Sequence, residues 1–175
     1  GSEMCIRDRF HRDSSCVMVP TPAMVDYCSE LGIRNIKIWS RGVDTELFDF
    51  YPIKTYRDNI AAVYVGRVSV EKNLEAFLNI NNNDIMKIVV GDGPQLKEYK
   101  KRYTDTHFTG RKTKEEIAFI LSGCDVMAWP SLTDTFGLVV IEGMACGLPV
   151  AAFDNEVNRY IIEDGKSGIL TENSL

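Results

Sequence analysis

Two acidic residues stand in an otherwise apolar stretch of the sequence, Pro130–Val150. Glu142 has only apolar residues and glycine beside it in the predicted helix Gly137–Cys146, and Asp134 lies eight positions earlier, in the segment that leads into this helix. The helix is so apolar that we expect it to be buried nearly all round, where an unpaired carboxylate is costly. The pattern therefore favours a ligand for Glu142. In the alternative, Asp134 only caps the helix and Glu142 pairs with an arginine inside the protein.

The residues at the start of this helix could bind an anion. Thr133 and Thr135 flank Asp134, and the backbone N–H groups of Phe136 and Gly137 come next. The first N–H groups of a helix have no partner within it and lie at the positive end of the helix dipole. We therefore expect a negatively charged group of a ligand at this place.

Two cations follow the predicted strand Ala61–Val65 and the glycine after it. Arg67 follows Gly66 at the strand end, and Lys72 falls in the first turn of the predicted helix Glu71–Leu78. Helix starts favour acids, so a lysine there suggests an anion nearby. Together with the free N–H groups, the two cations would bind a phosphate. In the alternative both are solvated surface charges, with Lys72 paired to a neighbouring acid.

Two further segments contain glycine and charge. Gly91 and Gly93 in the sequence GDGP could let the backbone approach a ligand closely, or could form a tight turn before a helix. In the segment WSRGVD, Gly42 suggests a turn and Asp44 is expected to cap the residues directly after it, while the role of Arg41 stays open.

Apolar strands alternate with helices along the chain. The predicted strands are Cys16–Pro20, Asn35–Trp39, Ala61–Val65, Met86–Val90, His107–Phe108, Val126–Trp129 and Val150–Phe153. The predicted helices are Pro22–Leu31, Glu71–Leu78, Gln95–Arg102, Lys114–Leu121, Gly137–Cys146 and Glu156–Ile162, with Ser40–Asn59 as a polar connection. Buried strands between helices predict a doubly wound, Rossmann-like α/β fold with one parallel sheet from Cys16 to Leu170. Ligands bind at the carboxyl ends of such strands, so we expect Arg67, Lys72, Asp134 and Glu142 around one cleft.

Composition limits the function classes. The 175 residues are 45% hydrophobic and 26% charged, as in soluble globular proteins, and the net charge of −5 argues against nucleic acid or a polybasic membrane patch. Five cysteines without a C-x-x-C pair and only two histidines indicate free thiols and no histidine-based metal site. No apolar run is long enough for a membrane span, and no signal peptide is visible, so we expect a cytoplasmic protein. Residues 1–15 are interpreted as an extraneous or linker segment and the end of a preceding domain, and residues 16–175 as one ligand-binding domain.

The ordered set of motifs resembles the carboxyl-terminal domain of family-4 retaining glycosyltransferases. The set comprises Gly66-Arg67 with Glu71-Lys72, then GDGP, then Asp134 and Glu142 at their spacing, and also RGVDTELF at Arg41–Phe48. The resemblance covers about Cys16 to Leu170. The segments WSRGVDTELF, YVGRVSVEKN and TDTFGLVVIE are similar to those of bacterial GDP-mannose-dependent alpha-mannosyltransferases.

The resemblance implies the C-terminal half of a GT-B fold and a role for each matching residue. Arg67 and Lys72 would hold the donor diphosphate, Glu142 the ribose hydroxyls and Asp134 the donor sugar, although the family usually has the longer Glu in place of Asp134. Gly110-Arg111-Lys112 would flank the base. The implied donor-binding residues are Gly66, Arg67, Lys72, Gly91, Gly93, Arg111, Asp134, Thr135, Phe136, Gly137, Leu138 and Glu142. Of these, Arg67, Lys72 and Asp134 would take part in catalysis.

The implied reaction is the transfer of a hexose from a nucleotide sugar, with GDP-mannose as a candidate, to a lipid-linked, glycan or small-molecule acceptor. No metal or other cofactor is expected, because no Asp-x-Asp metal motif occurs. These residues would bind the donor without transferring sugar, and any peripheral membrane contact would belong to the preceding half of the enzyme. Two alternatives stay open. A nicotinamide-dependent oxidoreductase would need a G-x-G-x-x-G segment, which is absent, and a non-catalytic nucleotide-binding module would leave Glu142 and the Arg67–Lys72 pair unexplained.

Overall fold

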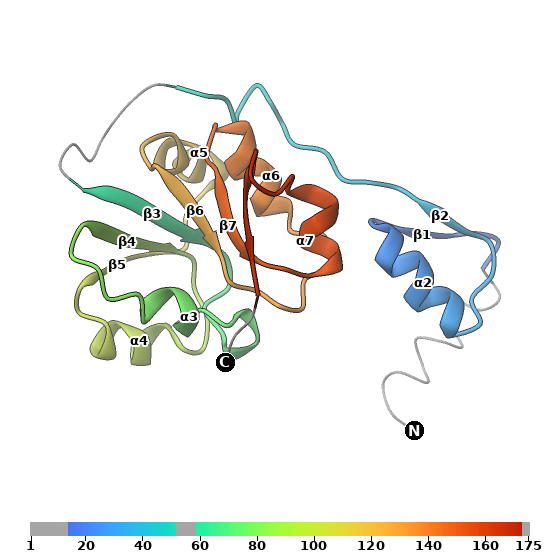
Figure 1. The fold of residues 1–175 in the computed structure, drawn as a ribbon, viewed down its shortest axis with the longest axis horizontal. Coiled ribbons are helices and arrows are strands. Elements are labelled where there is room, and N and C mark those ends of the chain that lie inside the picture. The colour runs from blue at the N-terminus through green and yellow to red at the C-terminus, as the bar shows by residue number, and fades with distance from the viewer. Residues whose placement is uncertain (1–13, 52–58, 173–175) are drawn as a thin grey trace. The chain divides into compact units, whose positions relative to one another are not determined.

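The computed structural model describes residues 14–51 and 59–172 (Figure 1). The chain divides into two units, and the boundary in the sequence falls between Gly42 and Val43. The interpretation of residues 1–15 therefore lies almost entirely outside the described residues. No helix within the described ranges has the length and apolar character needed to cross a membrane.

The first unit contains β1 (Val17–Val19), α2 (Pro22–Glu30) and β2 (Ile36–Ile38). Thr21 and Pro22 begin α2 as predicted, at the N-cap and first helical positions, and Gly32 ends it with a φ of 76°. Val19, Cys28 and Ile33 form a small core between the helix and the two strands.

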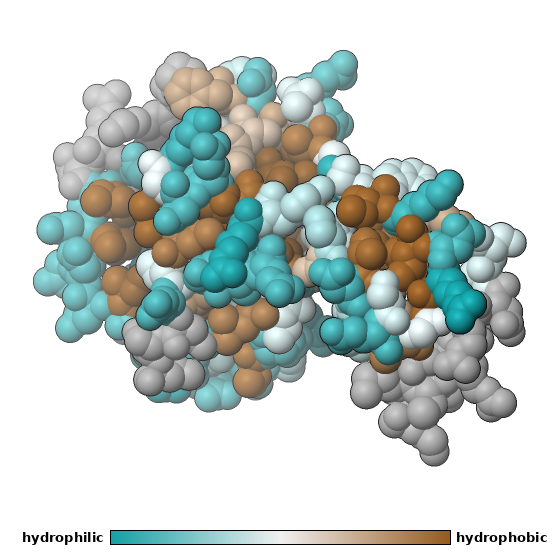
Figure 2. Space-filling model, turned by 45° about the vertical axis from the view of Figure 1, so that its right-hand side comes forward, coloured by the Kyte–Doolittle hydropathy of each residue, from teal (hydrophilic) through white to brown (hydrophobic). Residues whose placement is uncertain are grey.

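The two strands of this unit correct the expected single sheet. Among the described residues they pair only with each other, as a parallel two-stranded sheet. Their short apolar runs predicted strands covered on both faces, but α2 covers only one. Met18 is 58% exposed, and apolar side chains are visible at the surface of the unit in Figure 2.

The second unit is built on a six-stranded parallel sheet with the order β5-β4-β3-β6-β7-β8. The strands are β3 (Ile60–Val65), β4 (Ile85–Val90), β5 (Thr106–Gly110), β6 (Val126–Trp129), β7 (Val150–Phe153) and β8 (Gly168–Thr171). The strand order reverses between β3 and β6, which makes the sheet doubly wound and confirms the predicted Rossmann-like α/β class. Only β8 was not predicted.

Helices cover both faces of this sheet (Figure 1). The helical segments are the 3₁₀ turn η1 (Val70–Lys72), α3 (Glu75–Leu78), α4 (Leu96–Arg102), α5 (Lys114–Ser122), α6 (Leu138–Ala145) and α7 (Glu156–Ile161). In Figure 1, α3 and α4 lie on one side of the sheet, and α5, α6 and α7 lie on the other. Thr113 and Glu116 form the predicted capping box of α5, each side chain bonding the other's backbone N–H.

The central strands of the sheet contribute many of the fully buried residues of the core. Val63 and Tyr64 in β3 and Val89 in β4 are completely buried, so these strands are covered on both faces. The predicted polar connection Ser40–Asn59 contributes to this core, because Phe48 is only 1% exposed and packs into it. Asp44 accepts hydrogen bonds from the backbone N–H groups of Glu46 and Leu47, which confirms its capping role.

Two helix predictions were wrong in ways that affect the site. The predicted helix Glu71–Leu78 is broken at Asn73, whose left-handed φ of 51° separates η1 from α3. Lys72 therefore ends a 3₁₀ turn and does not lie in the first turn of an α-helix. The predicted burial of α6 nearly all round is also wrong, because most of its residues are only partly buried, although the helix packs against both the sheet and α5. Val140 and Gly143 are buried, whereas Leu138 is 46% exposed.

Candidate functional site

A pocket of about 600 Å³ opens at the carboxyl ends of β3, β4 and β5. Its floor comes from the turns after these strands, and α5 and α6 contribute one apolar residue each. The lining residues are Val65, Gly66, Arg67, Val90, Gly91, Asp92, Gly93, Arg111, Lys112, Ile117 and Val139. The predicted residues Gly66, Arg67, Gly91, Gly93 and Arg111 therefore lie together in one pocket.

The glycines of the floor are needed for close packing between the turns. Gly91 has a φ of 140°, and a Cβ atom there would lie 1.8 Å from the carbonyl oxygen of Gly66. A Cβ at Gly93 would lie 2.2 Å from the carbonyl oxygen of Val68, whose own N–H donates to the carbonyl of Asp92. The tight-turn interpretation of GDGP thus has a physical basis, and the turn also shapes the pocket.

Cations outnumber acids in the pocket lining. Arg67, Arg111 and Lys112 face one acid, Asp92, whose Oδ1 accepts a hydrogen bond from the N–H of Gly93 at 2.7 Å. Lys112 is paired with Glu116 at 2.7 Å. Within the described part of the chain neither guanidinium forms an ion pair, although the charge of Arg67 acts on Glu71. Two positive groups are thus left to bind an anion.

Lys72 and Asp134 meet outside this lining. Nζ of Lys72 lies 2.5 Å from Oδ1 of Asp134, and their side chains are 20% and 19% exposed. This bears out the alternative in which Lys72 pairs with an acid. The alternative role for Asp134 is wrong, because α6 has Gly137 at its N-cap position and no side-chain cap. Oδ2 of Asp134 is buried and has no hydrogen-bond partner among the described residues.

Glu142 lies in α6, one turn after the pocket residue Val139. Its side chain is 13% exposed, and Oε1 lies 3.8 Å from Nζ of Lys114, so its partner is a lysine of α5 and not an arginine. Burial raises the pKa of the Glu142 carboxyl, and the Lys114 ammonium group opposes this shift. The pair is long and its lysine is 69% exposed, and Glu142 is not among the residues that line the pocket.

The predicted anion site before α6 lies at the same edge of the sheet. Gly137 has a left-handed φ of 81°, and a Cβ there would lie 3.6 Å from Cζ2 of Trp129. Thr135, Phe136, Gly137 and Leu138 do not line the pocket, but the next residue, Val139, does. The first N–H groups of α6 have no partner within the helix.

The apolar wall of the pocket was missed from the sequence. Val65 and Val90 end buried strands, while Ile117 and Val139 lie in helices that come from other parts of the chain. The strand ends could have been included, because each directly precedes a predicted site glycine. The two helix residues become neighbours only when α5 and α6 pack on the same face of the sheet.

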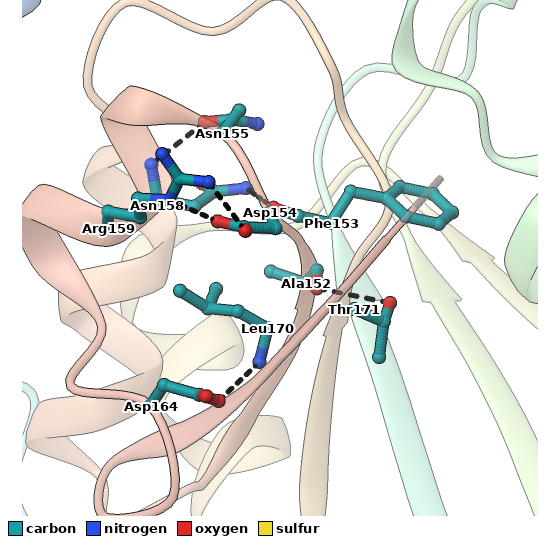
Figure 3. A network of polar contacts seen from close by, with 9 residues as sticks. All are labelled: Ala152, Phe153, Asp154, Asn155, Asn158, Arg159, Asp164, Leu170 and Thr171. Atoms are coloured by element: carbon teal, nitrogen blue, oxygen red, sulfur yellow. Dashed lines mark hydrogen bonds and ion pairs between the residues drawn. The ribbon is translucent and has the colours of Figure 1, made fainter. Parts of the chain in front are cut away.

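Strand β7 also ends at this edge of the sheet. In the loop that follows it, several polar side chains bond to one another or to the loop backbone (Figure 3). Arg159 forms a two-point ion pair with Asp154, which lowers the pKa of that carboxyl. The buried Asn158 is held within the loop, because its backbone N–H donates to the Asn155 side chain and its own amide donates to the Phe153 carbonyl. This loop therefore positions α7, and its arginine and aspartate neutralise each other.

Within residues 14–51 and 59–172, no three His, Cys, Asp or Glu side chains gather as a metal-binding group. The expectation that the reaction needs no metal or other cofactor stays a prediction.

Comparison with known proteins connects this architecture to a family. The family described as Glycosyl transferases group 1 matches residues 49–174. The sulfoquinovosyl transferase SQD2 of Arabidopsis thaliana is 31% identical in an alignment of 179 positions that covers 91% of this chain and 35% of that protein. The GDP-mannose-dependent alpha-mannosyltransferase of Corynebacterium glutamicum is 28% identical in an alignment of 171 positions that covers 93% of this chain and 41% of that protein.

The fold is shared with solved glycosyltransferase structures. The crystal structure of HepE from Anabaena in complex with UDP-glucose matches with a TM-score of 0.83 and 24% identity, over 97% of this chain and 53% of that one. The chain spans less than half of the length of the two curated relatives. Because the family match includes the whole six-stranded sheet and every turn of the pocket, the chain belongs to the Glycosyl transferases group 1 family.

Proposed function

We propose that the pocket binds the diphosphate of a nucleotide sugar, as the donor site of a glycosyltransferase that transfers a hexose with retention of configuration. The observation that carries this proposal is the pair of guanidinium groups, Arg67 and Arg111, that line the pocket without ion-pair partners among the described residues. Both residues are exposed and line the same pocket, so their charges can reach a ligand there. A ligand with negative charge explains them.

The charge arrangement suits the reaction. When the bond between sugar and diphosphate breaks, negative charge grows on the departing phosphate. Cations that are already in place stabilise that charge without having to reorganise. Arg67 and Arg111 would supply this stabilisation, with the N–H groups at the start of α6 as further donors. Glu142 would accept hydrogen bonds from the ribose hydroxyls and Asp134 from the donor sugar.

The Lys72–Asp134 pair gives Lys72 a second role in this proposal. Lys72 holds Oδ1 of Asp134, so the two charges cancel and the pair alone would not attract a phosphate. An ammonium group has three donors, so Lys72 can keep Asp134 and still donate to a phosphate oxygen of a bound donor.

GDP-mannose is the donor that we propose, with UDP-sugars as the competing class. The support is the Corynebacterium relative, which aligns with 93% of this chain and is named as GDP-mannose-dependent. Because the chain spans less than half of either curated relative, we propose donor binding for these residues and assign no acceptor to them.

A dye-displacement screen of GDP, UDP and NAD tests the proposal. We expect GDP to compete most strongly, UDP less and NAD least. Arg111→Ala should weaken GDP binding about tenfold, whereas Arg102→Ala should not change it, since Arg102 is exposed and pairs with Glu75 away from the pocket. If none of the nucleotides binds to the folded chain, the proposal is wrong, and a preference for UDP would replace GDP-mannose as the donor.

A further inference from the structure

Tyr64 lies directly beneath the turn that carries Arg67. It is completely buried in β3, and its hydroxyl group donates a hydrogen bond to the carbonyl oxygen of Arg67 at 2.9 Å. A Cβ atom at Gly66 would lie 2.6 Å from the Tyr64 oxygen, so the hydroxyl group packs against the turn itself. The bond fixes the orientation of the Arg67 backbone, from which its side chain enters the pocket.

The ring of Tyr64 connects this turn to the start of α6. It stacks on Trp129 with ring centres 6.1 Å apart and 19° between the planes. Trp129 in turn lies under Gly137, where an added Cβ would be 3.6 Å from its ring. One buried aromatic pair thus supports both places that are proposed to bind the donor phosphates.

The Tyr64 hydroxyl group is suited to donate this hydrogen bond permanently. Burial raises the pKa of the Tyr64 hydroxyl, and the nearby charges of Asp134 and Glu71 raise it further, so the group stays protonated at neutral pH. A buried hydroxyl without a partner is costly, so the bond to the Arg67 carbonyl is strongly favoured over an open turn.

We propose that Tyr64 is a positioning residue: its hydroxyl group, bonded to the Arg67 carbonyl, holds the Arg67 guanidinium where it meets the diphosphate of the donor. This rests on the proposed function of the pocket. Tyr64 itself does not line the pocket and would not touch the ligand.

The first test is Tyr64→Phe, which keeps the ring and its stacking but removes the hydroxyl group that donates the hydrogen bond. We expect GDP binding to weaken about fivefold, as for the loss of one hydrogen bond. The matched control is Tyr103→Phe, which removes a hydrogen bond of similar kind, to Asn79 at 3.0 Å, outside the pocket lining. It should leave the affinity unchanged.

A double-mutant cycle separates positioning from a general effect on the fold. In an Arg67→Ala background, Tyr64→Phe should change the affinity less than twofold, because no guanidinium remains to be positioned. Thermal unfolding of each variant shows that the compared chains are folded.

Four outcomes would overturn the proposal. An unchanged affinity of Tyr64→Phe, while Arg67→Ala weakens binding, refutes the positioning role and leaves the proposed function intact. An equal loss with and without Arg67 makes Tyr64 structural, as does a Tyr64→Phe chain that does not fold. Failure of the unmodified, folded chain to bind GDP or UDP overturns both the inference and the proposed function.

Discussion

Nζ of Lys72 lies 2.5 Å from Oδ1 of Asp134, although 62 positions separate the two residues in the sequence. The pair joins the 3₁₀ turn after β3 to the segment before α6. A second contact in the same place, from the Thr133 hydroxyl to the Glu71 carbonyl at 3.5 Å, joins the same two segments. The other oxygen of Asp134 is buried without a hydrogen-bond partner among the described residues. The carboxylate therefore depends on Lys72.

This dependence predicts an asymmetry between the two partners. Lys72→Met should lower the free energy of unfolding by about 2 kcal/mol, because it leaves a mostly buried carboxylate unpaired. Asp134→Asn should cost less, about 1 kcal/mol or below, because the freed lysine can turn toward water. Urea denaturation measures both. A larger loss for Asp134→Asn would show that the carboxylate does not rely on this lysine.

The close approach of the turns predicts different costs for two glycines of the same edge. Gly91→Ala should lower the free energy of unfolding by about 3 kcal/mol or more, because its Cβ would overlap the Gly66 carbonyl at 1.8 Å. Gly110→Ala should cost about 1 kcal/mol, since its φ is also positive, at 77°, but open space surrounds it. Thermal unfolding would compare them, and equal costs would mean that the backbone contact can relax.

The raised pKa of Glu142 predicts the sign of a pH effect. Because burial raises this pKa, the folded chain holds the proton more tightly than the unfolded chain. The contribution of Glu142 to stability is therefore greatest below the ordinary carboxyl pKa and is lost as the pH rises through the folded value. The stability of the wild type relative to Glu142→Gln should fall with rising pH across this window.

Glu116→Gln is the control, because the contribution of Glu116 to stability should change with pH in the opposite direction. Lys112 lowers the pKa of Glu116, so its contribution is present above the ordinary carboxyl pKa and is lost as the pH falls through the folded value. Urea unfolding at several pH values would show both slopes. Equal slopes for the two glutamates would contradict the assignment for Glu142.

The part of the fold that the sequence predicted best is the part with the plainest local pattern. The strands Val126–Trp129 and Val150–Phe153 are correct in both bounds, since each is a short apolar run ended by Pro130 or Asp154. The strand Gly168–Thr171 is an edge strand of the sheet. It was missed because its sequence, GILT, mixes apolar residues with glycine and threonine and is not a continuous apolar run.

The errors concern features that depend on tertiary contacts. An apolar run alone does not tell whether one or both faces of a strand are covered, so β1 and β2 were placed in the wrong sheet. The break at Asn73 reflects one left-handed residue within an apparently helical pattern. The rule for carboxyl strand ends predicted Arg67 in a cleft, and the family resemblance added Arg111. The partners of Lys72 and Glu142 could not be predicted, because they come from segments that meet only in the fold.

Glu142→Ala should harm ligand binding more than stability. Loss of a charged hydrogen bond to ribose would weaken nucleotide binding by roughly 1.5–3 kcal/mol, while removal of a partly desolvated carboxylate should leave the fold nearly unchanged. Glu156→Ala, at an exposed position at the start of α7, is the control for binding. A variant that unfolds readily but binds normally when folded would make Glu142 a structural residue.

Calorimetric titration of the chain with GDP and with UDP, each with and without EDTA, tests the donor site most directly. We expect modest binding that persists under chelation, favours GDP, and weakens with added salt, because the phosphate contacts are between charges and are screened. Binding that disappears with EDTA would contradict the expectation of a metal-free site. No binding of either nucleotide, in a sample shown to be folded, would contradict the donor site itself.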